Sequence, residues 1–193
     1  MNFFKKIQEE KDPGSVDGTS LKILKYPHPL LRTENAPIED FSQSLKSKAS
    51  QMLSVMYAAN GIGLAAPQVG INERLMVFNE SGDEEDKENE MILCNPIILR
   101  QSEEKWIREE GCLSFPLIEG EVERSLKIEI KYQTVEGEDR QLELEGMPAR
   151  IFLHEYDHLD KILFIDRLSQ RDLKMNQKRL DKYIKKYGPG AAP

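Results

Sequence analysis

Two histidines four residues apart constrain the fold of this chain more than any other feature of its sequence. They are His154 and His158, with Glu155 between them in the segment HEYDH. A helix is predicted here from about residue 148, where Pro suits a first helical turn, to about residue 160. Residues at i and i+4 share one helix face, so both imidazoles can bind one metal ion while Glu155 lies beside the open coordination position. The alternative interpretation places both rings on the surface, paired with nearby acids.

A catalytic metal site on such a helix needs a third protein ligand. Zinc proteases with a similar helix take it downstream, as a Glu on a later helix or as a His or Asp six residues beyond the second His. Here Phe164 stands at that position and no Glu follows His158. Upstream, Cys112 in the segment EEGCLSFP is a natural thiolate ligand that would complete a three-ligand site with a fourth position left for water. The alternative for Cys112 is a small buried apolar residue, which is the interpretation we prefer for Cys94.

A segment of small residues, GIGLAAPQ at 61–68, follows the first predicted helix. Its paired glycines let another backbone come close, which favours a peptide bound alongside as an added strand. Gln68 at its end offers a neutral amide donor that can stabilise negative charge developing on a carbonyl oxygen. The alternative is a plain turn between a helix and a strand.

The remaining periodicities predict a chain that mixes helices and strands. Apolar residues at three- and four-residue steps indicate a helix over about 40–61. Ser169 fits the N-cap of a C-terminal helix that ends at Tyr187, before a Gly-Pro pair. Short apolar or alternating segments predict strands in mostly antiparallel sheets. These segments are 75–78, 92–94 just before Pro96, 126–132 and 141–144.

Two polar stretches are expected to contribute no catalytic or binding residues. Residues 1–20 lack periodicity, which predicts a flexible N-terminal tail, and their acids and missing Arg are unlike a targeting sequence. Residues 80–90 hold seven acids and one Lys. Such a segment is too polar to bury, so we expect a solvated loop there.

Composition limits the class of protein. The 193 residues, with 39% hydrophobic and 32% charged side chains, are typical of one soluble globular domain. No apolar run approaches the roughly 18 residues of a membrane span, and the net charge of −7 argues against nucleic-acid binding over the whole surface. Two cysteines exclude a disulfide scaffold, and we expect no secretion.

Three segments together resemble the signature motifs of the peptide deformylases, in the same order and at similar spacing. The segments are GIGLAAPQ at 61–68, EGCLS at 110–114 and HEYDHL at 154–159. The form EGCLSFP is most similar to the bacterial and plastid members. The resemblance implies an α+β fold with antiparallel sheets around the metal-binding HExxH helix, an N-terminal helix and a C-terminal helix. It covers residues 21–168, the expected catalytic domain, which a basic helix and tail at 169–193 follow.

The resemblance also assigns a role to individual residues. It implies that one divalent metal ion is bound. Fe(II) is the expected ion, and Zn(II) and Ni(II) are the alternatives. The implied metal ligands are Cys112, His154 and His158. The implied general base is Glu155. The implied donors to the oxyanion are the side-chain amide of Gln68 and the backbone N–H of Leu113. The implied substrate contacts are Ile62, Gly63 and Gly111 for the peptide backbone, and Glu110 beside the methionine pocket.

The activity implied is hydrolysis of the N-formyl group from nascent peptides that begin with formyl-methionine, with release of formate. These peptides are the expected partners, and no membrane is expected. The segment 169–193 carries a net charge of +5, which favours docking to ribosomal RNA; the alternative is a solvated helix face that balances an acidic body. The expected location is the cytoplasm for a bacterial or viral source, and a plastid, apicoplast or mitochondrion for a eukaryotic one.

Two positions depart from the family pattern. Leu153 stands where the family has Gln before the first His, and Lys161 stands where it has Gly after the second. Gly relieves a left-handed helix end, so Lys161 costs about 1 kcal/mol if that geometry is kept, or else the helix end is remodelled. Leu153 removes a polar side chain next to a ligand, which affects ring orientation or water order. One alternative is therefore a weakly active or non-catalytic paralogue that binds peptides. Another, disfavoured by the missing downstream ligand, is a zinc metallopeptidase.

Overall fold

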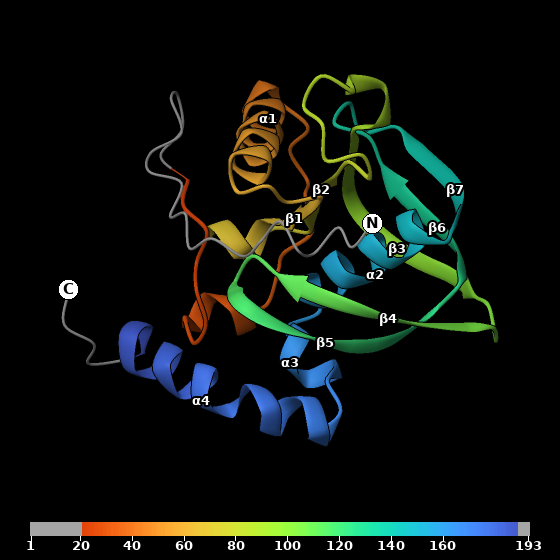
Figure 1. Ribbon diagram of the computed structural model, residues 1–193. Coiled ribbons are helices and arrows are strands. Elements are labelled where there is room, and N and C mark those ends of the chain that lie inside the picture. The colour runs from red at the N-terminus through yellow and green to blue at the C-terminus, as the bar shows by residue number, and fades with distance from the viewer. Residues whose placement is uncertain (1–20, 189–193) are drawn as a thin grey trace.

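The structure, a computed structural model, describes residues 21–188 (Figure 1). The tail expected at 1–20 and the last five residues, 189–193, lie outside the described residues. The described part forms a five-stranded sheet, a separate two-stranded hairpin and the helices that pack on them. None of the helices in residues 21–188 combines the length and the apolar character of a membrane span.

The larger sheet is antiparallel at every strand pair, which confirms the predicted sheet type. Pairing of Ile128 with Leu144 and of Ile130 with Leu142 puts the apolar side chains of the last two strands on one face. That face packs against the helix that carries the two histidines. In sheet order the strands are β1 (Gly63–Ala65), β2 (Leu75–Phe78), β3 (Met91–Gln101), β6 (Lys127–Gln133) and β7 (Asp139–Glu145).

The strand predicted to end before Pro96 does not end there, so this boundary is wrong. β3 continues through Pro96 to Gln101. Its register with β6 shifts between Cys94 and Ile97, so the proline, which has no N–H to donate, lies where the ladder is already interrupted. Asn95 adopts a positive φ of 49° at the same place. A bulge therefore replaces the predicted strand end.

A long hairpin, absent from the sequence-based prediction, lies between residues 105 and 125. β4 (Lys105–Cys112) pairs with β5 (Phe115–Ser125) through a two-residue turn. The buried side of these strands includes Glu110 and Arg124 beside apolar residues. Each of the two strands thus has one charged residue on its inner face, which interrupts the period-two apolar pattern that identifies strands from sequence.

The first predicted helix is confirmed with tighter bounds. α1 spans Gln43–Ala58 and packs against β1 and β2. It begins after Ser42, whose Oγ accepts the backbone N–H of Ser44 at 3.3 Å. It ends before Asn60, which has a φ of 53°.

The second and third predicted helices are also confirmed. α2 (Met147–Leu159) contacts β1, β2 and β7 on one side and β5 on the other, so it lies between the sheet and the hairpin. α4 (Gln170–Tyr187) runs along β5 (Figure 1), and Ser169 caps it by accepting the N–H of Asp172 at 3.1 Å. One short helix, α3 (Phe164–Arg167), was not predicted. Single 3-10 turns occur at Pro29–Arg32, Ala66–Val69 and Lys87–Asn89, the last within the largely exposed acidic loop.

The end of α2 keeps the left-handed geometry even though Lys161 replaces the glycine of the family pattern. Lys161 has a φ of 65°. Its N–H donates to the carbonyl of His158 at 3.2 Å, and the N–H of Ile162 donates to the carbonyl of Asp157 at 2.8 Å. These two bonds define a Schellman C-cap with a non-glycine residue in its left-handed position.

Changing Lys161→Gly is expected to raise the free energy of unfolding by about 1 kcal/mol, because glycine adopts positive φ without a Cβ clash. The thermal midpoint should rise by about 2 to 4 °C for a domain of this size. Urea unfolding of wild type, Lys161→Gly and the control Lys161→Ala measures the effect. Equal stability of all three would show that the helix end relaxes at no cost.

Candidate metal centre

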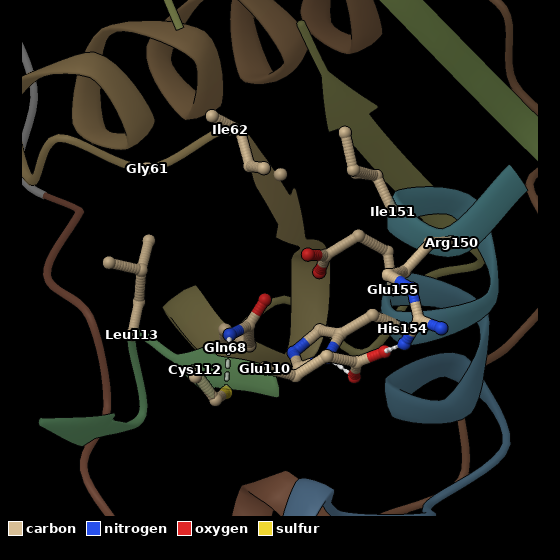
Figure 2. A pocket seen from close by; sticks show the side chains of 12 residues that line it. Gly61, Ile62, Gln68, Glu110, Cys112, Leu113, Arg150, Ile151, His154 and Glu155 are labelled. Atoms are coloured by element: carbon tan, nitrogen blue, oxygen red, sulfur yellow. Dashed lines mark hydrogen bonds and ion pairs between the residues drawn. The ribbon is translucent and has the colours of Figure 1, made fainter. Parts of the chain in front are cut away.

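The three sequence motifs meet around one small cavity between β1, the end of β4 and α2 (Figure 2). Its volume is about 30 Å³, more than the roughly 10 to 15 Å³ that one water needs. Nine of the ten predicted site residues line it, and His158 contacts Cys112 just behind. The lining also includes Gly61, Arg150 and Ile151.

The predicted metal ligands converge. One ligand atom from each of Cys112, His154 and His158 lies within 4.8 Å of the others, and Sγ of Cys112 is 3.3 Å from Nε2 of His158. Cys112 ends β4 at a register shift after Gly111, and such a bulge re-aims a side chain. The two histidines lie on one face of α2. One thiolate and two imidazoles with a free fourth side form a donor set that fits a divalent metal ion.

The two histidine rings differ in their hydrogen bonds and in their pKa values. Nδ1 of His154 lies 3.0 Å from Oε2 of Glu110. Burial alone would lower the pKa of His154, but in the metal-free protein its hydrogen bonds with Cys112 and Glu110 raise the pKa well above its usual range, so a metal would displace the Nε2 proton while Nδ1 keeps donating to Glu110. Burial lowers the pKa of His158 well below its usual range, and neighbouring His154 adds to the lowering. A neutral ring with a free lone pair is the form that binds a metal.

Glu155 is a buried carboxyl group directed into the cavity (Figure 2). Burial raises its pKa to about 7, although the charges of His154 and Arg124 act in the opposite direction. A pKa near neutrality suits a group that must both accept and return a proton. Gly63 makes room for it, because a Cβ at position 63 would lie 2.5 Å from Oε1 of Glu155.

The amide of Gln68 is oriented by its own backbone neighbourhood. Its Oε1 accepts the backbone N–H of Ala65 at 2.7 Å. Its Nε2 therefore faces the other way and donates to Sγ of Cys112 at 3.6 Å and to Oγ of Ser114 at 3.4 Å. The donor end of the amide points into the site, as Figure 2 shows.

The turn that carries Leu113 is held by residues just before the 3-10 turn at Pro29–Arg32. Nζ of Lys25 donates to the carbonyl of Leu113 at 2.8 Å, and the N–H of Tyr26 donates to the carbonyl of Ser114 at 3.0 Å. Both bonds use carbonyl groups of the turn. They hold the two peptide units that follow the Leu113 N–H, the predicted second donor to an oxyanion.

Comparison with known proteins agrees with this geometry. Residues 20–174 match the sequence model of the family described as polypeptide deformylase. The chain belongs to the peptide deformylase family. Peptide deformylase 1B of Arabidopsis thaliana, chloroplastic/mitochondrial by name, is 45% identical over 88% of this chain and 62% of its own length. The peptide deformylase of Thermotoga neapolitana is 42% identical over 82% of this chain and 93% of its own length.

Solved structures give the same result for the fold. A crystal structure of peptide deformylase from Plasmodium falciparum superposes with a TM-score of 0.86 at 42% identity, covering 89% of this chain and all of that one. A plant peptide deformylase 1B structure gives 0.84 at 43% identity, over 89% of this chain and 95% of that one. The chain spans about 60% of the length of the plant relatives it matches.

This deformylase chain also contains a buried charge network that the motifs did not reveal. Glu110 accepts from Arg124 at 2.8 and 3.0 Å, from Arg150 and from His154. Burial alone would raise the pKa of Glu110, but the charge of Arg124 and the hydrogen bonds with His154 and Arg124 outweigh it and hold the pKa well below its usual range. Asp157 extends the network, accepting from Arg124 at 2.8 Å.

The inward orientation of both arginines could have been recognised from the sequence. Arg124 follows Val122 and Gly120 at two-residue steps on the buried side of β5. Arg150 precedes His154 by four residues on α2, so both lie on the same helix face. Each arginine thus occupies an inward position, where an unpaired charge would be too costly to bury.

Glu110→Gln is expected to lower stability by about 3 to 5 kcal/mol at pH 7, because it leaves two buried guanidinium groups short of an acceptor. Since the folded pKa of Glu110 is lowered, its stabilisation is complete above the unfolded pKa and is lost as pH falls from about 5. The gap between the wild-type and variant stabilities should therefore narrow steadily as the pH falls from about 5 to 3. Urea unfolding of the metal-free proteins across this range tests it, with the exposed loop variant Glu84→Gln as control. A stability gap that stays constant with pH would contradict the assignment.

Proposed function

We propose that this chain is a metal-dependent peptide deformylase that removes the formyl group from the N-terminal formyl-methionine of nascent polypeptides and releases formate. Membership of the family supports the reaction class. The observation that carries the proposal is the convergence of Cys112, His154 and His158 beside the buried carboxyl group of Glu155. In this proposal residues 21–168 are the catalytic domain and α2 is its central metal-binding HExxH helix.

Cys112, His154 and His158 would hold one divalent ion, Fe(II) first, with Zn(II) or Ni(II) as substitutes. When bound, the ion supplies Lewis acidity, which activates water and polarises the formyl carbonyl. Glu110 keeps the His154 ring in place from behind, at 3.0 Å. Gln68 donates to the sulfur of Cys112 from the other side, at 3.6 Å.

Glu155 would act as the base and then as the acid. It accepts a proton as the water oxygen bonds to the formyl carbon, and it returns that proton to the nitrogen as the carbon–nitrogen bond breaks. In the metal-free protein burial raises the pKa of this carboxyl group to about 7, towards the range in which a group can both accept and return a proton at neutral pH. The amide of Gln68 and the N–H of Leu113 would stabilise the negative charge on the formyl oxygen, an effect of roughly 3 to 4 kcal/mol for one well-placed donor.

The peptide would bind as an extended strand between β1 and the end of β4. β1 is the edge strand of its sheet, so its outer side is available for pairing. Ile62 and Gly63 on one side and Gly111 on the other would contact the peptide backbone. The wall formed by Glu110, Arg150 and Ile151 borders the cavity where the first side chain would enter.

Glu155→Gln is expected to lower kcat for formate release from a formyl-Met tripeptide by about 10² to 10⁴-fold, because the amide cannot accept the proton. Metal content and the thermal midpoint should match the wild type. Glu121→Gln, an exposed change on β5, is the control and should keep full activity. Near wild-type turnover of a metal-replete Glu155→Gln protein would contradict the assigned base.

A second partner, the ribosome, is proposed for α4. Its basic side chains are exposed, while Leu180 and Tyr183 hold the helix to the hairpin core. A basic exposed helix face attracts RNA phosphates, and such binding weakens with salt. The exposed basic residues are Arg171, Lys174, Lys178, Arg179, Lys182, Lys185 and Lys186.

Reversing three of these charges tests docking without removing the helix from the core. The triple variant Lys174→Glu, Lys178→Glu and Lys182→Glu is expected to weaken ribosome cosedimentation at low salt by about 10-fold or more. A control with the same change of net charge reverses three other exposed or half-exposed lysines, at 46, 127 and 131. Cosedimentation that is absent in the wild type at low salt, or equal in both variants, would contradict docking through α4.

Location follows the source of the chain in this proposal. The plant relatives are chloroplastic or mitochondrial by name. This supports a plastid, apicoplast or mitochondrial location for a eukaryotic source. For a bacterial or viral source we propose the cytoplasm.

A further inference from the structure

Arg124 on β5 bridges the strand and the helix that carry the candidate metal ligands. Its Nε and one terminal nitrogen donate to the two carboxylate oxygens of Glu110 at 2.8 and 3.0 Å. Its other terminal nitrogen donates to Oδ2 of Asp157 at 2.8 Å and to the backbone carbonyl of Leu153 at 3.3 Å. The residue is 6% exposed. One buried guanidinium thus holds β4 with one edge and α2 with the other.

Every acceptor in this bridge lies close in sequence to a ligand. Glu110 is two residues before Cys112 on β4. On α2, Leu153 and Asp157 directly precede the two histidines. A movement of either acceptor group therefore moves a ligand.

The backbone does not tie β4 to α2 in the same way. β4 forms its hydrogen-bonded ladder with β5, and the main contacts of α2 are with β1, β2, β5 and β7. The position of the sulfur relative to the rings therefore depends on side chains that cross from the hairpin to the helix. Metal sites tolerate only about 0.2 Å of error in their bond lengths, so this crossing must be rigid.

Arginine suits the task because its guanidinium is planar and presents its donors in a fixed fork. Three of its nitrogens are used here, two on one carboxylate and one on the helix. A lysine at this position would keep the charge but could not hold both elements in one geometry. Arg124→Lys therefore separates rigid bridging from simple charge balance.

We propose that Arg124 is a positioning residue that keeps Cys112 aligned with His154 and His158 and thereby slows release of the metal ion. This inference rests on the metal site of the proposed function. Arg124 is not among the residues that line the cavity. It acts through Glu110 and the residues that precede the histidines.

Metal release measures this role directly. Wild type, Arg124→Lys and Arg124→Met are loaded with Zn(II) or Co(II), and release to an excess of chelator is followed. The Arg124 variants are expected to release Zn(II) about 10 to 100-fold faster, the usual effect of losing a group that orients a ligand. In the Co(II) proteins the thiolate-to-metal absorption band should shift or weaken, because it reports the sulfur–metal geometry.

Two matched variants control for charge and for stability. Arg167→Met removes a guanidinium that binds the same Asp157 carboxylate, at 2.6 and 3.0 Å, but does not reach Glu110. Leu45→Ala opens a cavity in the apolar cluster beneath α1, which contains none of the residues of the bridge. Both are expected to release metal at close to the wild-type rate.

The outcomes separate this inference from the proposed function. Wild type that binds no Zn(II) would overturn the metal site itself, and the inference with it. Wild type that retains Zn(II) while Arg124→Lys releases it at the same rate with an unchanged Co(II) spectrum would overturn the positioning role alone. Equal acceleration in Leu45→Ala would also overturn it, by assigning the effect to stability. Should Arg124→Met fail to fold, Arg124→Lys, which keeps the charge, decides the result.

Discussion

The buried carboxylate of Glu110 is the contact on which the arrangement of the site depends. It lies on β4 and accepts hydrogen bonds from Arg124 on β5 and from Arg150 and His154 on α2. A carboxylate taken out of water is costly unless it is paired and hydrogen-bonded. Here the groups that offset this cost belong to two other elements, β5 and α2, so pairing one charge also brings the hairpin to the helix and orients an imidazole ring.

The site residues that spacing alone predicts are those that lie close together in the sequence. His154, Glu155 and His158 follow from the helical repeat, and the chemistry of their side chains indicated Cys112 and Gln68. Resemblance to a known family placed these distant segments in one site and added Leu113. The hairpin was not predictable, because its inner face buries Glu110 and Arg124 where a strand pattern requires apolar residues. The network was missed for the same reason: a charged residue is assigned to the surface until its partners, far away in sequence, are known. The predicted end of the strand before Pro96 was wrong because a bulge, which the sequence does not reveal, accommodates the proline.

The two departures from the family pattern leave the site geometry intact. Lys161 keeps the left-handed helix end that a glycine would adopt, so α2 ends as the family pattern expects. Leu153 packs in the core beneath α2, and its backbone carbonyl still accepts from Arg124. A side chain can change here without moving the histidines, because the helix is held through its backbone and through Asp157. The non-catalytic alternative therefore gains no support from either position.

The hairpin that carries the sulfur ligand packs its buried side against α4, which begins about 45 residues after β5 ends. Phe115, Ile118 and Val122 share one apolar cluster with Leu180 and Tyr183. During synthesis these strand residues emerge long before the helix that shields them. During synthesis the apolar side chains of the hairpin are therefore exposed at first. The site is complete only after residues 170–187 have left the ribosomal tunnel and packed against the hairpin.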